Sequence, residues 1–490
     1  MNTSYIKVIA GIALATSLAS CGDKFLETDM FGKIDSEIAL DNVSTVGYAL
    51  NGAYYNLGYY EFAGTESTVF GDLASDISYW NQETGHFNDI YSFTPSETSV
   101  ILLDVWEYGY KVIDNATRVI EGAEKLYAEA SEDDKALLDR YMAEAYALRA
   151  YASLNLVNIF AHQVKVEGQD FSSMPGIVIV KSAVGQDQKV SRSTIGETYA
   201  YIESDLNSSL QHFAAAEFAP EEDVYFTPKA VKGLQARVYL YQEKWQDACD
   251  AAKDALELGN ISSLVSTPSA YKALYNGGAS NTESFFYLAI NSTDNWSANS
   301  MGTLWSSYGY SPSPWLQSIM ADDDCRRAVW GWTSDNPQIP KFNGGKFTGL
   351  SGNPAFGTCY LINAPEMYLI QAEAKAKLGD AAGAATALYE VAKRNPAIAS
   401  VSDLPADAAG VLAFIKDERA RELFQEGLRL YDLRRWGGNV NVNADQAPNI
   451  SWLIKDYNIS DAVYPIPDSE INTGMGVTQN EGWLSTFPSI

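Results

Sequence analysis

The sequence predicts a mainly α-helical protein in which antiparallel helix pairs form a scaffold that carries long irregular loops. Two observations lead to this prediction. Apolar and small residues recur at helical spacing on both sides of a short break in residues 228–258, and again in 365–394. In contrast, residues 62–95 and 282–357 lack helical periodicity and are rich in Gly, Ser, Asn and aromatic residues. Long loops of this kind in a compact protein usually carry function.

The first half of the chain predicts separate long helices. A helical rhythm runs through 34–60, with Ser36 or Asp41 as the expected cap, and another through 100–127. Acidic residues after Ser131 indicate the start of a helix that runs to about Phe160, so that 111–160 would hold a further helix pair. The next helix covers Ser191 to Phe213, with Ser193 or Thr194 as its cap.

The two helix pairs follow in the second half. The first breaks near Glu243–Lys244, and the second turns at Gly379–Asp380. Closely spaced alanines let the two helices of a pair approach and stack, which is typical of tetratricopeptide-like units. Between the pairs, residues 282–357 predict loops with a few short strands, such as Phe285–Ile290.

Residues 415–437 predict a helix, a break at Gly427 and a second helix. Five arginines crowd this segment of a chain whose net charge is −28, and carboxylates alternate with nearly all of them. We therefore expect arginine–carboxylate pairs that lock neighbouring elements, in preference to an anion site. The arginines are Arg419, Arg421, Arg429, Arg434 and Arg435, and close pairs are expected for Asp417 with Arg421, Glu418 with Arg421, Glu426 with Arg429 and Asp432 with Arg435.

Composition excludes several functions. The net charge of −28 repels nucleic acid and anionic lipid headgroups. Four cysteines and three isolated histidines show no metal-ligand spacing, so no metal and no cofactor are expected. The run Asp322–Asp323–Asp324 lacks the spacing of a calcium loop and is interpreted as a solvated acidic turn. No nucleotide-binding or hydrolase motif is present, although a two-carboxylate glycosidase stays compatible with the composition.

The N-terminus predicts export. Lys7 precedes a short apolar run, Val8 to Leu18, which is typical of a secretory signal over residues 1–20 and too short to span a membrane. Leu18-Ala19-Ser20-Cys21 resembles a bacterial lipobox, which implies cleavage before Cys21 and acyl chains on that residue.

The arginine-rich segment also carries a family resemblance. Glu418-Arg419, Glu422-Leu423, Glu426-Gly427 and Asp432 to Gly437 resemble the C-terminal signature of the SusD/RagB family of outer-membrane lipoproteins. Ala143-Glu144-Ala145, Ala372-Glu373-Ala374 and Tyr464-Pro465-Ile466-Pro467 extend the resemblance over the mature chain. The chain departs from the family pattern at Ile362 to Pro365 and at Glu481 and Trp483.

The resemblance implies a single SusD-like domain over 21–490 and a lipid-anchored protein on the outer face of the outer membrane. Such a protein breaks no bond. It captures an oligosaccharide or polysaccharide and passes it to a TonB-dependent, SusC-like transporter, which it covers as a lid.

Aromatic residues in the two loop regions are the predicted ligand site. Sugar rings pack their C–H faces on flat aromatic side chains, while their hydroxyls need polar partners. Trp106, Trp245 and Trp436 fall in helical stripes and are expected in the core. The predicted binding residues are Trp80, Asn81, Trp296, Trp305 and Tyr308.

Three other functions stay open at this point. The same fold could bind peptides, as the family also suggests. An all-helical surface glycosidase would release product from polysaccharide. A helical-repeat scaffold that binds only protein would have no affinity for small ligands. The sequence does not specify the glycan.

Overall fold

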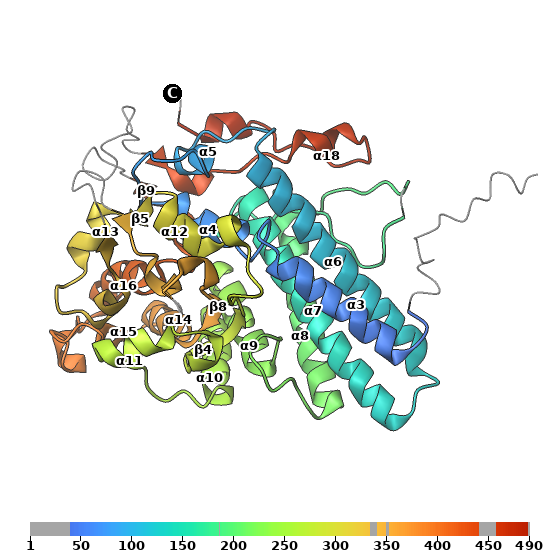
Figure 1. Ribbon diagram of the computed structural model, residues 1–490, viewed down its shortest axis with the longest axis horizontal. Helices are drawn as coiled ribbons and strands as arrows, with labels where there is room; N and C mark the ends of the chain where they lie inside the picture. Colours follow the sequence, from blue (N-terminus) through green and yellow to red (C-terminus); the bar gives the residue numbers. More distant parts are fainter. Residues whose placement is uncertain (1–39, 186, 334–340, 349–351, 441–456, 489–490) are drawn as a thin grey trace, which may run out of the picture. The chain divides into compact units, whose positions relative to one another are not determined.

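The computed structural model describes residues 40–185, 187–333, 341–348, 352–440 and 457–488. The predicted signal over 1–20 and the predicted lipid-bearing Cys21 lie outside this part. The unit described here begins at Asn42. Its α-helices dominate, and its strands are short and pair two by two (Figure 1). The mainly helical prediction is therefore confirmed.

Four long helices from the first half of the chain pack side by side (Figure 1). Helix α3 contacts α6 and α7, α6 contacts α7, and α7 contacts α8. The predicted start of α7 is confirmed, and the Ser131 side chain accepts a hydrogen bond from its first turn. Of the two caps expected for the next helix, Thr194 forms a capping box at the start of α8. The bounds are Val43–Gly58 (α3), Val100–Tyr127 (α6), Glu132–Phe160 (α7) and Ile195–Ala216 (α8).

The start of α3 differs from the prediction. The cap is Asn42, in place of Ser36 or Asp41. The Asn42 Oδ1 atom accepts the backbone N–H of Thr45 at 3.1 Å, and the Thr45 hydroxyl accepts the N–H of Asn42, which completes a capping box. A threonine at the third helical position, in place of the usual Glu or Gln, hides this signal in the sequence.

Both predicted helix pairs are present. Helices α9 and α10 pack against each other, as do α14 and α15, and α10 also packs on α14. The break in the first pair contains Glu243 at φ +55°, and Gly379 turns the second pair at φ +87°. The bounds are Pro228–Tyr241 (α9), Trp245–Leu258 (α10), Ala364–Lys377 (α14) and Ala381–Ala392 (α15).

The two irregular regions contain more structure than predicted, and they pair with each other. Strand β1 (Ser78–Trp80) of the first region lies antiparallel to β5 (Tyr310–Pro312) of the second. Residues 62–95 also hold helix α4 (Glu66–Leu73), so the prediction of an irregular stretch is wrong there. All eight residues of α4 are buried, including Glu66 and Asp72. A helix without an exposed face has no amphipathic period for the sequence to reveal.

The arginine-rich segment forms the predicted helix, break and helix, α16 (Ala408–Leu423) and α17 (Arg429–Arg435). Its arginines are mostly buried. Four of them form ion pairs with carboxylates, and Arg434 donates to the Asn158 and Ala161 carbonyl oxygens, which confirms the structural interpretation. The pairs are Arg419 with Asp432 at 2.6 Å, Arg421 with Glu418 at 2.7 Å, Arg429 with Asp76 at 2.7 Å, and Arg435 with Glu373 at 2.5 Å and with Asp432 at 2.9 Å.

Two expectations about charged residues are wrong. Glu426 pairs with Lys346 at 2.6 Å instead of with Arg429, because Arg429 already binds Asp76. Asp324 is not solvated: its side chain is fully buried and pairs with the buried Arg326 at 2.7 Å. Its neighbour Asp322 is exposed as expected.

The remaining helices and strands are short. Among the described residues, no helix is both long and apolar enough to cross a membrane. The α-helices are Asn88–Tyr91 (α5), Pro268–Leu274 (α11), Met301–Ser307 (α12), Pro314–Ile319 (α13) and Asp468–Asn472 (α18). The strands are Lys165–Val166 (β2), Gln169–Asp170 (β3), Ser284–Leu288 (β4), Trp332–Thr333 (β6), Lys341–Phe342 (β7), Cys359–Asn363 (β8), Asn439–Val440 (β9) and Tyr457–Asn458 (β10), and β4 pairs with β8 where a strand was predicted.

Candidate functional site

Two of the predicted binding tryptophans are packed inside the loop regions. Trp80, at the end of β1, is 8% exposed and lies against Tyr91 and Tyr310. Trp305, on α12, is fully buried and contacts Tyr310 and Phe424 edge to face. Neither ring has a face open to a ligand in this structure. Their packing holds the two loop regions together around Tyr310.

Asn81 and Tyr308 lie next to this packed core and are half-buried. The Asn81 backbone N–H donates to the Gly309 carbonyl oxygen at 3.0 Å, which extends the β1–β5 pairing by one step. The Tyr308 ring stacks on the exposed His86 imidazole, with centroids 3.9 Å apart. The structure therefore brings Trp80, Asn81, Trp305 and Tyr308 into one neighbourhood, at the junction of the two loop regions.

Trp296 lies in a different and more open setting. It is half-buried, and its indole N–H donates to the Gly58 carbonyl oxygen at 3.0 Å, at the end of α3. Tyrosines surround the ring: Tyr59 lies 4.7 Å from it, Tyr60 6.0 Å and Tyr55 6.2 Å, as centroid distances. We call Trp296, Tyr55, Tyr59, Tyr60 and Tyr108 the Trp296 cluster.

Helix α6 completes this cluster. The ring of Tyr108 is parallel to that of Tyr59, with centroids 4.7 Å apart, and the Lys111 ammonium lies 3.8 Å from the Tyr108 centroid. Tyr55 is 60% exposed, so the cluster reaches the surface. The four tyrosines were not among the predicted site residues. The doublets Tyr54-Tyr55 and Tyr59-Tyr60 are the signal that could have found three of them.

Carboxylates border the Trp296 cluster. A hydrogen bond to Glu61 raises the pKa of Tyr60. Burial, together with the charges of Glu61 and Glu107, raises the pKa of Asp104 to about 6. The Glu107 carboxylate also pairs with Lys111 at 2.7 Å. The border thus offers acceptors for hydroxyl groups beside aromatic faces.

This arrangement suits a ligand that combines apolar ring faces with many hydroxyl groups. Aromatic faces pack on C–H patches, and carboxylates accept hydrogen bonds from hydroxyls. Among the described residues, no group of three or more His, Cys, Asp and Glu side chains is placed to hold a metal ion. The aromatic rings and carboxylates at the cluster can stack on a ligand and accept its hydrogen bonds.

Two family models match parts of this chain. Residues 316–483 match the family model described as the SusD family, and residues 22–240 match a second model described as starch-binding and associating with the outer membrane. The SusD-like protein P25 of Formosa agariphila is 23% identical over an aligned length of 538 residues. The alignment covers 95% of this chain and 96% of that protein.

Solved structures share the fold. A SusD superfamily protein from Bacteroides vulgatus superposes with a TM-score of 0.79 at 24% identity, covering 90% of this chain and 99% of that one. A SusD-like carbohydrate binding protein from the same species gives a TM-score of 0.69 at 19% identity, covering 92% of this chain and 98% of that one. The mainly helical fold of this chain is thus shared with SusD superfamily structures.

Proposed function

Since the chain belongs to the SusD/RagB family, we propose that it is a non-catalytic glycan-binding lipoprotein of the outer membrane. It captures an oligosaccharide at the cell surface and passes it to a TonB-dependent transporter. Cys21 carries the lipid anchor in this proposal. The outer-membrane location draws on the description of the family model that matches residues 22–240.

The Trp296 cluster is the observation that carries this proposal. Five aromatic rings from α3, the turn after it, α6 and the segment before α12 gather there, and Tyr55 exposes most of its surface. Such rings give broad contact with sugar rings at little entropic cost, since each has only two rotatable side-chain bonds. The carboxylates of Glu61 and Asp104 supply hydroxyl acceptors at the edge.

The predicted site residues have different roles in this proposal. Trp296 is a stacking residue. Asn81 and Tyr308 contribute polar and aromatic contacts at the junction of the loop regions, where the half-buried Tyr308 stacks on His86. Trp80 and Trp305 keep that junction packed, because their rings are buried.

Affinity electrophoresis tests the proposal. The intact protein, purified in detergent, is run through gels that contain plant, host or microbial polysaccharides. We expect retardation in at least one gel without release of reducing sugar, and loss of that retardation on Trp296→Ala. Trp332→Ala is the matched control, since Trp332 is also a tryptophan, is 42% exposed and lies in β6, outside the cluster.

The other outcomes favour the other functions. No retardation in any gel would contradict the proposal and favour a peptide ligand. Release of sugar from the polysaccharide would favour a surface glycosidase. Retardation that survives Trp296→Ala would keep glycan binding and move the site away from the Trp296 cluster.

A further inference from the structure

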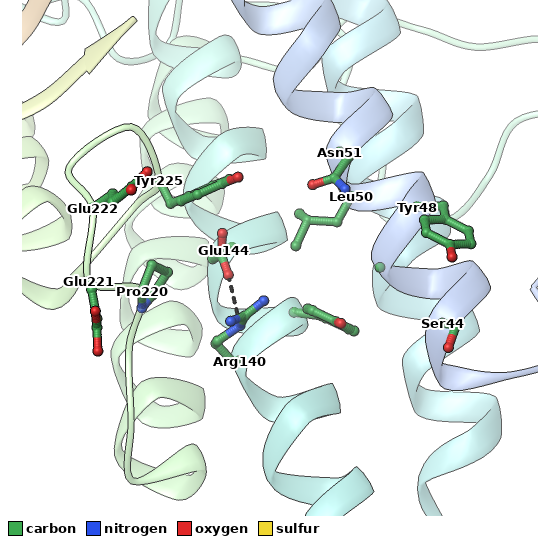
Figure 2. Close-up of a pocket in the computed structure, with 12 residues that line it drawn as sticks. Ser44, Tyr48, Leu50, Asn51, Arg140, Glu144, Pro220, Glu221, Glu222 and Tyr225 are labelled. Atoms are coloured by element: carbon green, nitrogen blue, oxygen red, sulfur yellow. Dashed lines mark ion pairs between the residues drawn. The ribbon is translucent and has the colours of Figure 1, made fainter. Parts of the chain in front are cut away.

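A cavity lies between α3, α7 and the segment before α9 (Figure 2). Its volume is about 510 Å³, which is within the usual range for small-ligand sites. None of its lining residues belongs to the Trp296 cluster. Figure 2 shows Arg140 and Glu144 projecting from α7 between α3 and the segment that carries Glu221 and Glu222.

Glu144 and two aromatic rings hold the Arg140 guanidinium, and its terminal N–H groups are available to a ligand. Its Nε atom lies 3.2 Å from Glu144 Oε1, and its guanidinium lies 5.0 Å from the Tyr141 ring centroid and 5.7 Å from that of Phe218. In the part of the chain that the structure describes, no hydrogen bond is found for its two terminal nitrogens. A fixed guanidinium with free N–H groups is a site for acceptor oxygens.

Glu144 forms the floor of the cavity. It is 1% exposed, and its Oε2 atom accepts a hydrogen bond from the Tyr54 hydroxyl at 2.7 Å. The Tyr54 hydroxyl in turn accepts the backbone N–H of Phe226 at 2.8 Å. Burial raises the pKa of Glu144 to about 7. This chain of hydrogen bonds ties α7 to both neighbouring walls and holds the Glu144 carboxylate beside the Arg140 guanidinium.

The walls carry further polar and aromatic groups. Glu221 and Glu222 are exposed on one side, and Asn51 and the 73% exposed Tyr48 lie on α3. A close approach brings Tyr141 against α3: a Cβ atom on Gly47 would lie 2.8 Å from the Tyr141 hydroxyl oxygen. Aromatic rings therefore border the cavity beside both donors and acceptors.

The charges select the class of ligand. Glu221 and Glu222 disfavour an anion, and a simple cation cannot accept the N–H groups that Arg140 presents beside Glu144. A neutral polyol suits both, because each hydroxyl accepts a hydrogen bond from the guanidinium and donates one to a carboxylate. We propose that this cavity is a second carbohydrate site, which binds a neutral mono- or disaccharide unit. The inference rests on the proposed function for its ligand class, while its residues are separate.

The ligand class is tested with sugars that differ in charge. Glucose, galactose, mannose and maltose are titrated into the intact protein by calorimetry, beside glucosamine as a cation and glucuronate as an anion. We expect at least one neutral sugar to bind, and the charged analogues to bind about tenfold more weakly. Absence of binding by every neutral sugar, or tighter binding of a charged analogue, would overturn the inference.

Variants place the binding in the cavity. Arg140→Lys keeps the positive charge and removes the planar set of N–H donors of the guanidinium. We expect it to weaken binding of the neutral sugar about tenfold. Arg118→Lys makes the same change in an exposed ion pair on α6 and is the control. Asn51→Trp fills the cavity from α3 and should also weaken binding. Thermal unfolding of each variant verifies that it is folded. Equal affinity for Arg140→Lys and Arg118→Lys would overturn the assignment.

The two proposals fail separately. In one outcome, no polysaccharide gel retards the protein, but a neutral sugar binds, and this binding depends on Arg140 and survives Trp296→Ala. This outcome would support the cavity site and reject the proposed function. Retardation that depends on Trp296, in a protein that binds none of the neutral sugars, would reject the cavity site alone.

Discussion

Arg429 and Asp76 form a two-point ion pair between distant parts of the chain. The Nε and Nη2 atoms of Arg429, on α17, donate to the two carboxylate oxygens of Asp76 at 2.7 and 2.8 Å. Asp76 precedes β1, the strand that ends in Trp80. The third nitrogen, Nη1, donates to the Lys416 carbonyl oxygen at 2.9 Å. The arginine-rich segment thus fixes the start of the loop region that carries part of the predicted site.

Asp76→Asn is expected to destabilise the protein. The substitution leaves the buried guanidinium of Arg429 beside a neutral amide, so the free energy of unfolding should fall by about 3 kcal/mol. Urea unfolding measures the change. Asp114→Asn is the control, because its pair with Arg118 is exposed and is worth less than about 1 kcal/mol. Equal effects of the two substitutions would show that the Arg429 pair contributes little.

Gly427→Ala is expected to destabilise the protein for a steric reason. Gly427 has φ +73°, and a Cβ atom there would lie 1.8 Å from the Thr68 carbonyl oxygen on α4. The backbone of α4 must shift to accept it, which should cost about 2 kcal/mol or more. Gly438→Ala is the control, since a Cβ atom at Gly438 meets nothing within 4 Å. A neutral result for Gly427→Ala in urea unfolding would contradict the close approach.

The sequence predicted the elements whose signals are local. The two helix pairs have an apolar period and a turn, and Ser131 and Thr194 cap their helices through residues three positions away. The break at Gly427 was also visible, because glycine accepts positive φ at no steric cost. These features need no knowledge of what packs against them.

The predictions that failed depend on distant contacts. Asp324 was expected in solvent. It is buried because its neighbour Arg326 also pairs with Glu418, which lies far along the chain and leaves no local signal. The exposure of a loop aromatic residue depends on distant contacts in the same way: Phe424 covers Trp305, and Tyr55 and Tyr59 lie against Trp296. Which aromatic residues face solvent is therefore a property of the fold, and a stretch of loop composition does not show it.

Stability is expected to fall as pH rises, in part through Glu66. Burial, reinforced by the carboxylates of Asp104 and Glu61, raises the pKa of Glu66 from 4.5 to about 9. The folded protein keeps this proton over a range in which the unfolded chain has released it. The free energy of unfolding therefore declines between pH 4.5 and about pH 9. Asp72 and Glu144, whose pKa values burial raises to about 7, act in the same direction.

Glu66→Gln tests this pH dependence. The amide stays neutral, so the decline of the thermal midpoint between about pH 5 and about pH 8 should be shallower than in the wild-type protein. Glu132→Gln removes a carboxylate that is 90% exposed and should keep the wild-type slope. Equal slopes for Glu66→Gln and the wild type would mean that Glu66 ionises as an ordinary surface carboxylate.

Trp305→Ala and Trp296→Ala are expected to separate stability from binding. Trp305 is fully buried, so its truncation should lower the free energy of unfolding by about 3–5 kcal/mol. Trp296 is half-buried at the surface, so Trp296→Ala should cost less stability and abolish retardation by polysaccharide. Urea unfolding and affinity electrophoresis of both variants give the comparison. A stable Trp305→Ala protein that loses retardation would instead make Trp305 a ligand contact, exposed by a rearrangement of α12 on binding.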